Sequence, residues 1–238
     1  MSDRPIILLT RPKDGSKRFA DRVDDRFGDA VEIVISPLQR IEWVEFAMPD
    51  EPPNGLIFTS QNGVLGSVRV DSLAGLPAFC VGPQTTGAAT AAGYRAMDCG
   101  GDAEAVIAAI LDQTHKGPLL HIRGEHGRGR IAERLTEAGI PTDECVAYRQ
   151  VSEPMSDAAA KLLKGGRPVI APLFSPRSAK LFYNALPTAA APWVAVISPN
   201  AAEPLDDMLR RRMIVADTPD AQGMLDAIAG LLAASKQT

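Results

Sequence analysis

The stretch from Leu8 to Val34 reads LLTRPKDGSKRFADRVDDRFGDAVEIV, and the stretch from Leu120 to Val146 reads LHIRGEHGRGRIAERLTEAGIPTDECV. An offset of 112 residues superposes the two stretches and places Arg11 on Arg123. The same offset aligns three further pairs: Arg18 with Arg130, Ala20 with Ala132, and Arg22 with Arg134. Because self-similarity at a fixed spacing marks a repeated structural unit, the chain is expected to contain two related halves.

Two shorter blocks repeat in the same order at an offset of 116 residues. The first pair is Leu56–Val64 (LIFTSQNGV) over Leu173–Lys180 (LFSPRSAK). The second pair is Cys80–Thr86 (CVGPQTT) over Val196–Ala202 (VISPNAA). The aligned residues are Phe58 with Phe174, Thr59 with Ser175, and Pro83 with Pro199. Three blocks in the same order at a nearly constant offset support a duplication.

Each half alternates a short apolar run, a polar loop and an amphipathic segment. In the first half, Ile6–Thr10 precedes such a loop, and Phe19, Val23 and Phe27 follow at helical spacing. Short buried strands that alternate with helices indicate parallel sheets covered on both faces. The predicted fold class is therefore α/β, with two doubly wound parallel-sheet lobes related by a weak internal repeat.

The boundary between the lobes has two readings. Pro37–Glu42 (PLQRIE) and Tyr148–Glu153 (YRQVSE) are polar, extended segments that follow repeated blocks, as expected of two strands crossing between lobes. In that reading, residues 1–36 and 151–238 form one discontinuous lobe and residues 41–147 form the other. The crossings then lie near 37–40 and 148–150. A single split near residue 115 fits the sequence as well.

Composition excludes several classes of partner. The formal charge of −4 and the pI near 5.4 are unlike the basic footprint of nucleic-acid-binding proteins, and 5% aromatic residues are too few for base-stacking platforms. Ser72–Tyr94 and Leu181–Ala202 carry no charge, but prolines interrupt both, so they are expected to be buried strands and loops instead of membrane spans. We therefore expect no nucleic-acid or membrane partner, and a monomer.

Cysteine and histidine positions argue against a metal or a disulfide framework. Three cysteines at wide spacings (Cys80, Cys99 and Cys145) are typical of a reducing compartment, so a cytoplasmic location is expected. The three histidines (His115, His121 and His126) do not share a helix face, and no cysteine pair has metal-ligand spacing. The sequence also contains no GxGxxG, GxxxxGK[ST] or GxSxG motif. No metal is expected, and the missing motifs argue against dinucleotide, nucleoside-triphosphate and hydrolase chemistry.

The motifs TRP, FTSQNGV, VGPQTTGAA, IRGE, VAYRQ, FSPRSA and TPDAQGMLDAI together resemble uroporphyrinogen-III synthases, in the family's order and over nearly the whole chain. The resemblance implies a cofactor-free lyase that closes linear hydroxymethylbilane into uroporphyrinogen III, with loss of water and inversion of the fourth pyrrole ring. It also implies two α/β lobes joined by a pair of strands, with the first lobe discontinuous. One departure is ISPNAA, where Ser198 replaces a glycine and Ala201 replaces a hydroxyl residue.

The implied substrate carries eight carboxylates, which helix N-termini at the carboxyl ends of parallel strands can bind. Loop residues in the matching motifs are therefore the candidate substrate-binding residues. They are Arg11, Ser60, Asn62, Gly63, Gly82, Thr85, Arg123, Ser175, Ser178 and Ser198. A structural role is the alternative. It is helix capping for Ser60, Asn62, Ser175 and Ser178, and close backbone approach for Gly63 and Gly82. Arg11 and Arg123 can equally be structural.

Tyr148, in VAYRQ, matches the tyrosine that the family pattern places at the lobe junction and is the candidate proton donor. A phenol has an ordinary pKa of about 10, so it carries its proton at neutral pH, as a general acid must. A structural hydrogen bond at the junction is the alternative role. A different class of function also stays open: a two-lobed binding module that senses an anionic metabolite without chemistry and does not need Tyr148.

Overall fold

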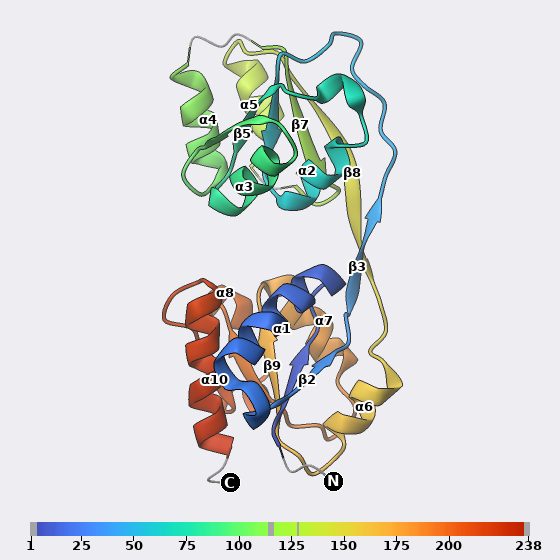
Figure 1. Cartoon of the computed structure of the whole chain (residues 1–238), viewed down its shortest axis with the longest axis vertical. Coiled ribbons are helices and arrows are strands. Elements are labelled where there is room, and N and C mark those ends of the chain that lie inside the picture. The colour runs from blue at the N-terminus through green and yellow to red at the C-terminus, as the bar shows by residue number, and fades with distance from the viewer. Residues whose placement is uncertain (1–3, 114–116, 128, 236–238) are drawn as a thin grey trace. The chain divides into compact units, whose positions relative to one another are not determined.

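The computed structural model describes residues 4–113, 117–127 and 129–235. The chain divides into two compact units, and it passes between them twice (Figure 1). Unit 1 comprises Met1–Arg40 and Val151–Thr238, and unit 2 comprises Ile41–Gln150. Both units contain parallel sheets with helices, so the α/β prediction is confirmed.

Unit 1 is built on a five-stranded sheet in which the described strand pairs are parallel. Its spatial order is β11-β10-β9-β1-β2. The strands are β1 (Ile6–Leu9), β2 (Glu32–Ile35), β9 (Val169–Leu173), β10 (Trp193–Val196) and β11 (Met213–Val215). All residues of β1 and β9 are buried, as expected of central strands covered on both faces.

Helices cover both faces of this sheet. They are α1 (Lys13–Phe27), α6 (Asp157–Leu163), α7 (Pro176–Ala185), α8 (Pro199–Ala202), α9 (Asp207–Arg210) and α10 (Ala221–Ser235), and a 3₁₀ turn, Gly28–Ala30, follows α1. Ile6 and Leu8 pack with α6, α7, α8 and α9, whereas Ile7 and Leu9 pack with α1 and α10. The alternation of side chains along β1 thus produces two cores, one on each face.

Unit 2 contains most of a six-stranded sheet in the order β3-β8-β7-β4-β5-β6. The strands are β3 (Gln39–Trp43), β4 (Gly55–Phe58), β5 (Pro77–Cys80), β6 (Arg95–Asp98), β7 (Leu119–Gly124) and β8 (Thr142–Ser152). The pairs from β8 to β6 are parallel. Val44 N–H donates to Ala147 O and Glu153 N–H donates to Leu38 O, so β3 and β8 run antiparallel. These two strands carry the chain between the units.

The helices of unit 2 also lie on both faces of its sheet. They are α2 (Gln61–Ser67), α3 (Pro83–Ala91), α4 (Ala103–Leu111) and α5 (Ile131–Glu137), with a 3₁₀ turn at Asp71–Leu73. Val64 of α2 and Ala89 of α3 belong to one core, and Ile110 of α4 and Leu135 of α5 belong to the other. Within the described ranges, no helix combines the length and the apolar content needed to cross a bilayer.

The two sheets have the same spatial order once the sequence repeat is applied. β11, β10, β9, β1 and β2 of unit 1 correspond to β6, β5, β4, β7 and β8 of unit 2. Only the chain order differs, because β1 and β2 begin unit 1 whereas β7 and β8 end unit 2. The buried helical residues Phe19 and Val23 fall on the buried Ile131 and Leu135 at the offset of 112. The fold therefore agrees with a duplicated strand-loop-helix plan.

One detail of the expected repeat is wrong. The sequence alignment places Thr59 on Ser175, but the structure makes Ser60 and Ser175 the N-caps of the equivalent helices α2 and α7. The two cores support this correction. Phe58 packs on the face of its sheet that α2 covers, whereas Phe174 packs on the face opposite α7, so the two phenylalanines are not equivalent. This block therefore repeats at 115 residues instead of 116.

The duplicated order creates one topological switch point in each unit. In unit 1 the switch lies between β1 and β9, and in unit 2 it lies between β4 and β7, because the chain there winds away in opposite directions along the sheet. Ligands of open α/β sheets bind outside the carboxyl ends of the strands at such points. The loops that follow β1, β9, β4 and β7 are therefore where a site is expected.

Candidate functional site

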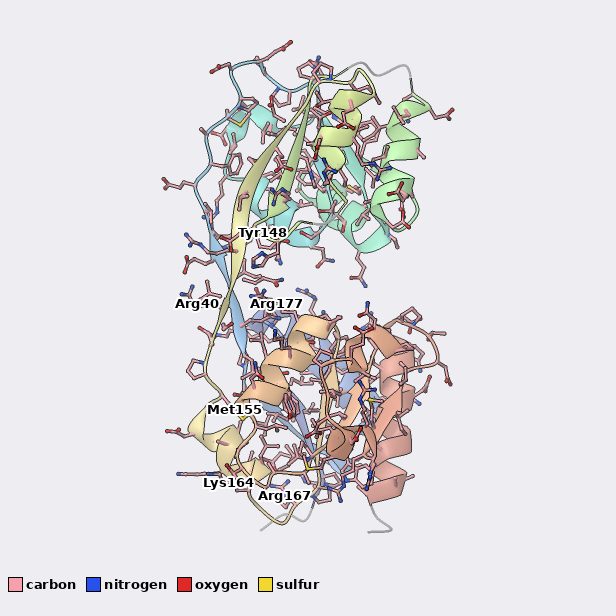
Figure 2. The ribbon with its side chains drawn as sticks, turned by 180° about the vertical axis from the view of Figure 1, so that it is seen from behind. Arg40, Tyr148, Met155, Lys164, Arg167 and Arg177 are labelled. Atoms are coloured by element: carbon pink, nitrogen blue, oxygen red, sulfur yellow. The ribbon has the colours of Figure 1, made fainter. Side chains whose placement is uncertain are left out.

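Tyr148 lies at the carboxyl edge of the unit 2 sheet. It stands on β8, is 8% exposed, and its Oη lies 2.9 Å from Ser60 Oγ (Figure 2 labels Tyr148). Ser60 ends the loop after β4, one of the two strands at the switch point. Two polar residues 88 positions apart are thus brought into a hydrogen bond at the place where the fold favours ligand binding.

The backbone next to Tyr148 is shaped to receive its ring. The pairing of β7 with β8 shifts between Arg123 and Gly124, so that Gly124 lies opposite Tyr148. A Cβ on Gly124 would lie 2.6 Å from Cζ and 2.9 Å from Oη of Tyr148. Since real Cβ atoms do not approach that closely, only glycine at position 124 leaves the phenol where it is.

An aromatic residue on β3 also contacts the tyrosine. Trp43 packs edge-on against Tyr148, with ring centroids 6.4 Å apart and an interplanar angle of 67°. The guanidinium of Arg69 lies 4.9 Å from the centroid of the same indole. Edge-to-face packing of this kind fixes ring orientation in addition to burying area. Ser60, Gly124 and Trp43 therefore all restrict the position of the phenol.

The Ser60 hydroxyl oxygen makes two hydrogen bonds. Its Oγ caps α2 by accepting from Gly63 N–H at 3.2 Å, and the same atom meets Tyr148. Gly63 is itself a close-packing glycine, because a Cβ there would lie 2.5 Å from Ile122 O on β7. The capping hydrogen bond orients the Ser60 hydroxyl, and the close packing of α2 on β7 positions the first turn of α2 that forms this bond.

The remaining candidates of unit 2 lie around the first turns of α2 and α3. Asn62 is half-buried in α2, Gly82 precedes α3 with extended backbone, and Thr85 is 5% exposed within α3. Gln61 Nε2 donates to Gln84 O at 3.2 Å and links these two turns. They therefore lie beside one another at the carboxyl edge.

Arg123 is turned to a neighbouring strand instead of an open loop. Its guanidinium donates to both carboxylate oxygens of Glu144 at 3.0 and 2.5 Å, and to the carbonyls of Gly124 and Glu125 at 2.8 and 3.1 Å. The hydrogen bonds and charge of Glu144 raise the pKa of Arg123, and Arg123 in turn lowers the pKa of Glu144. This bidentate pair occupies much of the hydrogen-bonding capacity of the guanidinium.

Arg11, its counterpart in the repeat, has a different environment. Its guanidinium lies 4.0 Å from the centroid of Phe174, whose ring packs edge-on against Phe19 at 4.8 Å. Burial, and then the charge of Arg18, lower the pKa of Arg11. Among the residues that the structure describes, Arg11 makes no ion pair with a carboxylate. It lies at the switch point of unit 1, directly after β1.

The three serine candidates of unit 1 are helix caps. Ser175 caps α7 and forms a capping box with Ser178, in which each hydroxyl accepts from the other residue's backbone N–H at 3.1 and 3.0 Å. Ser198 caps α8 by accepting from Ala201 N–H at 3.4 Å. The structural role considered for these residues is therefore present, and it does not exclude a ligand at the same helix ends.

A cavity of about 480 Å³ lies beside Arg123 in unit 2 and contains His121 in its wall. His121 is 2% exposed, its Nε2 lies 3.4 Å from Thr59 Oγ1, and its Nδ1 has no partner among the described residues. Burial lowers the pKa of His121 to about 4. No group of three or more potential metal ligands occurs in the described part of the chain, and His115 lies outside that part.

The sequence analysis missed four residues of this region: Trp43, Arg69, Gly124 and Glu144. A glycine inside an apolar strand and one of only two tryptophans were available signals. Gly124 lies opposite Tyr148 because of the shift of register between β7 and β8, which sequence pattern does not encode.

The chain is similar to known proteins over nearly its whole length. The family model described as uroporphyrinogen-III synthase HemD matches residues 21–226. The solved uroporphyrinogen-III synthetase of Helicobacter pylori 26695 is 17% identical with a TM-score of 0.68, over 96% of this chain and 99% of that one. A mutant uroporphyrinogen III synthase of Thermus thermophilus is 14% identical with a TM-score of 0.52, over 96% and 99%. No curated protein matches the chain.

Proposed function

The chain belongs to the uroporphyrinogen-III synthase family, whose members are lyases of haem biosynthesis, and we propose that it closes hydroxymethylbilane into uroporphyrinogen III. The family match, which extends over residues 21–226, is the observation that carries this conclusion. The match begins after the TRP segment, so the assignment does not depend on Arg11. The fold shared with the Helicobacter pylori enzyme is consistent with it.

Tyr148 is the proposed proton donor. In the first step, the C–O bond of the hydroxymethyl group breaks, the hydroxyl leaves as water with a proton from the phenol, and the pyrrole nitrogen stabilises the resulting cation. General acid assistance of this kind accelerates a step by about 10²- to 10⁴-fold. The position of Tyr148 at the switch point, with its oxygen beside Ser60, supports this role.

The hydrogen bonds of Ser60 support a particular arrangement of protons. Ser60 Oγ accepts from Gly63 N–H, and its own proton is then available to the Tyr148 oxygen 2.9 Å away. In that arrangement the phenolic proton points away from Ser60 and is free to reach the leaving hydroxyl. Ser60 is therefore proposed as the residue that orients the phenol, besides its role as cap.

After water leaves, the substituted α-carbon of the fourth ring attacks the cation and forms a spiro intermediate. The bond from that carbon to its original bridging carbon then breaks, and the bridging carbon bonds to the free α-carbon of the same ring. The proton lost from this α-carbon restores the pyrrole and can return to the phenolate, and the ring is thereby inverted. The protein contributes by positioning, because holding the chain end near the attacking carbon decides which isomer forms. Arg11, Asn62, Gly63, Gly82, Thr85, Ser175, Ser178 and Ser198 are proposed to bind the substrate carboxylates. Arg123 is proposed to contribute to substrate binding through the backbone around it, because its side chain is paired with Glu144.

A coupled assay that makes hydroxymethylbilane in situ tests the proposed activity. Spontaneous closure gives the type I isomer, so we expect added protein to shift the product to type III. Product that stays type I at high protein concentration would favour the binding module that senses an anionic metabolite. The acidic composition also supports our proposal of no nucleic-acid partner, and the three widely spaced cysteines support a cytoplasmic location. We further propose that the protein is a monomer.

A further inference from the structure

A polar groove of about 420 Å³ lies at the amino edge of the unit 1 sheet. Its wall comes from the segments that precede β9, β10 and β11, and from the end of α10. Because the strands are parallel, this edge is opposite the carboxyl edge that holds Arg11, Ser175 and Ser198. The groove is therefore separate from the proposed substrate loops.

Positive charge dominates the groove. Three basic residues line it, Lys164, Arg167 and Arg212, and none of its described lining residues is acidic. Figure 2 shows Lys164 and Arg167 at the turn between α6 and β9. Arg167 already has a counter-ion, because its Nη2 donates to Glu32 at 2.6 Å and its guanidinium also binds Arg4 O. The charge of Arg167 is thus neutralised within the protein.

The other two charges have no carboxylate partner among the residues that the structure describes. Arg212 is half-buried, donates to the carbonyl of Ala191 and lies 4.7 Å from the centroid of Trp193, but it pairs with no carboxylate among the described residues. Lys164 is exposed, and its ammonium group makes no hydrogen bond or ion pair within the described ranges. A half-buried guanidinium without a counter-ion retains a desolvation cost that an anionic ligand would offset.

The guanidinium of Arg212 is also held in place before any ligand arrives. Its contacts with Ala191 and Trp193 fix its plane, so that binding an anion would cost little additional side-chain entropy. Trp193 adds an aromatic surface to the same wall. An anchored charge, a second charge on a flexible stem and an aromatic wall together suit a flat ligand with two negative groups.

We propose that this groove binds a small dianion carried on a planar ring, with one acidic group at Arg212 and the other at Lys164. A pyrrole ring with two carboxylates belongs to this class. That identification rests on the proposed function, because each pyrrole ring of hydroxymethylbilane carries two carboxylates. The groove is thus a second site for the same chemical class, at the amino edge of the unit 1 sheet and opposite the substrate loops of that sheet.

Calorimetric titration of the wild-type protein with pyrrole-2,5-dicarboxylate tests the site. We expect saturable binding, and Arg212→Met and Lys164→Met should each weaken it about tenfold, as expected for the loss of one charged contact. Lys161→Met is the matched control, because Lys161 is exposed on α6 but does not line the groove. Lys164 is exposed as well, so its variant keeps the test valid if Arg212→Met fails to fold.

Fluorescence gives a second readout, because the chain has two tryptophans and Trp43→Phe leaves Trp193 as the reporter. A saturable change in its emission at the calorimetric affinity supports the site. The proposal is overturned if no saturable binding occurs, or if the Arg212 and Lys164 variants keep wild-type affinity. It is also overturned if inorganic phosphate binds as tightly as the ring compound. The wild-type preparation used for calorimetry is assayed for type III product, so failure of the groove proposal and failure of the enzymatic proposal are distinguished.

Discussion

Ser60 in unit 2 and Ser175 in unit 1 occupy equivalent positions, yet their hydroxyls have different partners. Both cap the helix that follows the strand at the switch point. Ser175 closes a capping box with Ser178, so its hydroxyl is engaged within its own helix turn. Ser60 instead meets the phenol of Tyr148 on another strand. The two units therefore share the N-cap, but the second partner of the capping hydroxyl differs between them.

The two equivalent arginines of the repeat also have different partners. Arg123 in unit 2 is locked in a bidentate pair with Glu144, whereas Arg11 in unit 1 stacks on Phe174 without a carboxylate partner in the described chain. Unit 1 therefore holds the arginine that has no carboxylate partner among the described residues, and unit 2 holds the proposed proton donor. The differences between the two units lead to five predictions, given from the largest expected effect to the smallest.

Removing the phenolic hydroxyl should have the largest effect. Tyr148→Phe keeps the ring packed between Gly124 and Trp43 but removes the proposed proton donor. We expect kcat to fall about 1000-fold with little change in KM, which is within the range for a general acid. Unchanged turnover in the coupled assay would remove Tyr148 from the mechanism and leave it a structural residue.

Lowering the pH should destabilise the protein through His121. The folded-state pKa of about 4 lies below the ordinary value of 6.5, so the unfolded chain binds more protons between these values. The stability contributed by the neutral imidazole is present above pH 6.5 and is lost as pH falls towards 4, by about 3 kcal/mol. Urea unfolding at several pH values measures it. His121→Gln should flatten the profile and exposed His126→Gln should not.

A methyl group on Gly124 should push the tyrosine ring away. For Gly124→Ala we expect about 2 kcal/mol of destabilisation from overpacking and a kcat lowered by about 30-fold, because the phenol must move. Gly87→Ala is the matched control. Gly87 lies in α3 with open space around it, so that variant should be slightly more stable. Full activity in Gly124→Ala would show that the position of the ring is not critical.

Replacing the two equivalent caps tests the central comparison directly. Ser60→Ala and Ser175→Ala should each cost about 1 kcal/mol in unfolding free energy, because each removes an N-cap. Only Ser60→Ala should also lower kcat, by about tenfold, since it alone removes the hydrogen bond to Tyr148. Equal kinetic effects of the two variants would contradict the divergence of the caps.

The smallest effect should come from the two arginines. Arg11→Met should raise KM about fivefold, because it removes the proposed anion-binding charge, which lies over Phe174, and keeps an apolar side chain in its place. Arg123→Met should mainly lower stability, because it leaves Glu144 without its partner. Kinetics and urea unfolding of both variants separate the two outcomes. A larger rise in KM for Arg123→Met would reverse the roles assigned to them.

Much of the fold was predictable because periodicity and repetition act locally. The alternation of buried runs and amphipathic segments predicts parallel sheets, and Ser60, Ser175 and Ser198 sit where the N-cap preference places hydroxyl residues. The alignment of Thr59 with Ser175 failed by one residue. Only the sheet faces and the helix caps show that Ser60 is the true counterpart.

The site was less predictable because its contacts depend on strand register. Arg123 and Glu144 are 21 residues apart and meet across neighbouring strands, so nothing in the spacing indicates that the arginine is already paired. Gly124 lies opposite Tyr148 only because the pairing shifts after Arg123. A residue type and its loop can be read from sequence, whereas the direction in which its side chain is held requires the tertiary structure.

The isomer composition of the product tests the central claim most directly. With hydroxymethylbilane generated in situ, the fraction of uroporphyrinogen III should rise with the concentration of wild-type protein until it accounts for nearly all of the product. Tyr148→Phe at the same concentrations should leave mostly the type I isomer. A type III fraction that does not depend on the concentration of the wild-type protein would contradict the proposed activity.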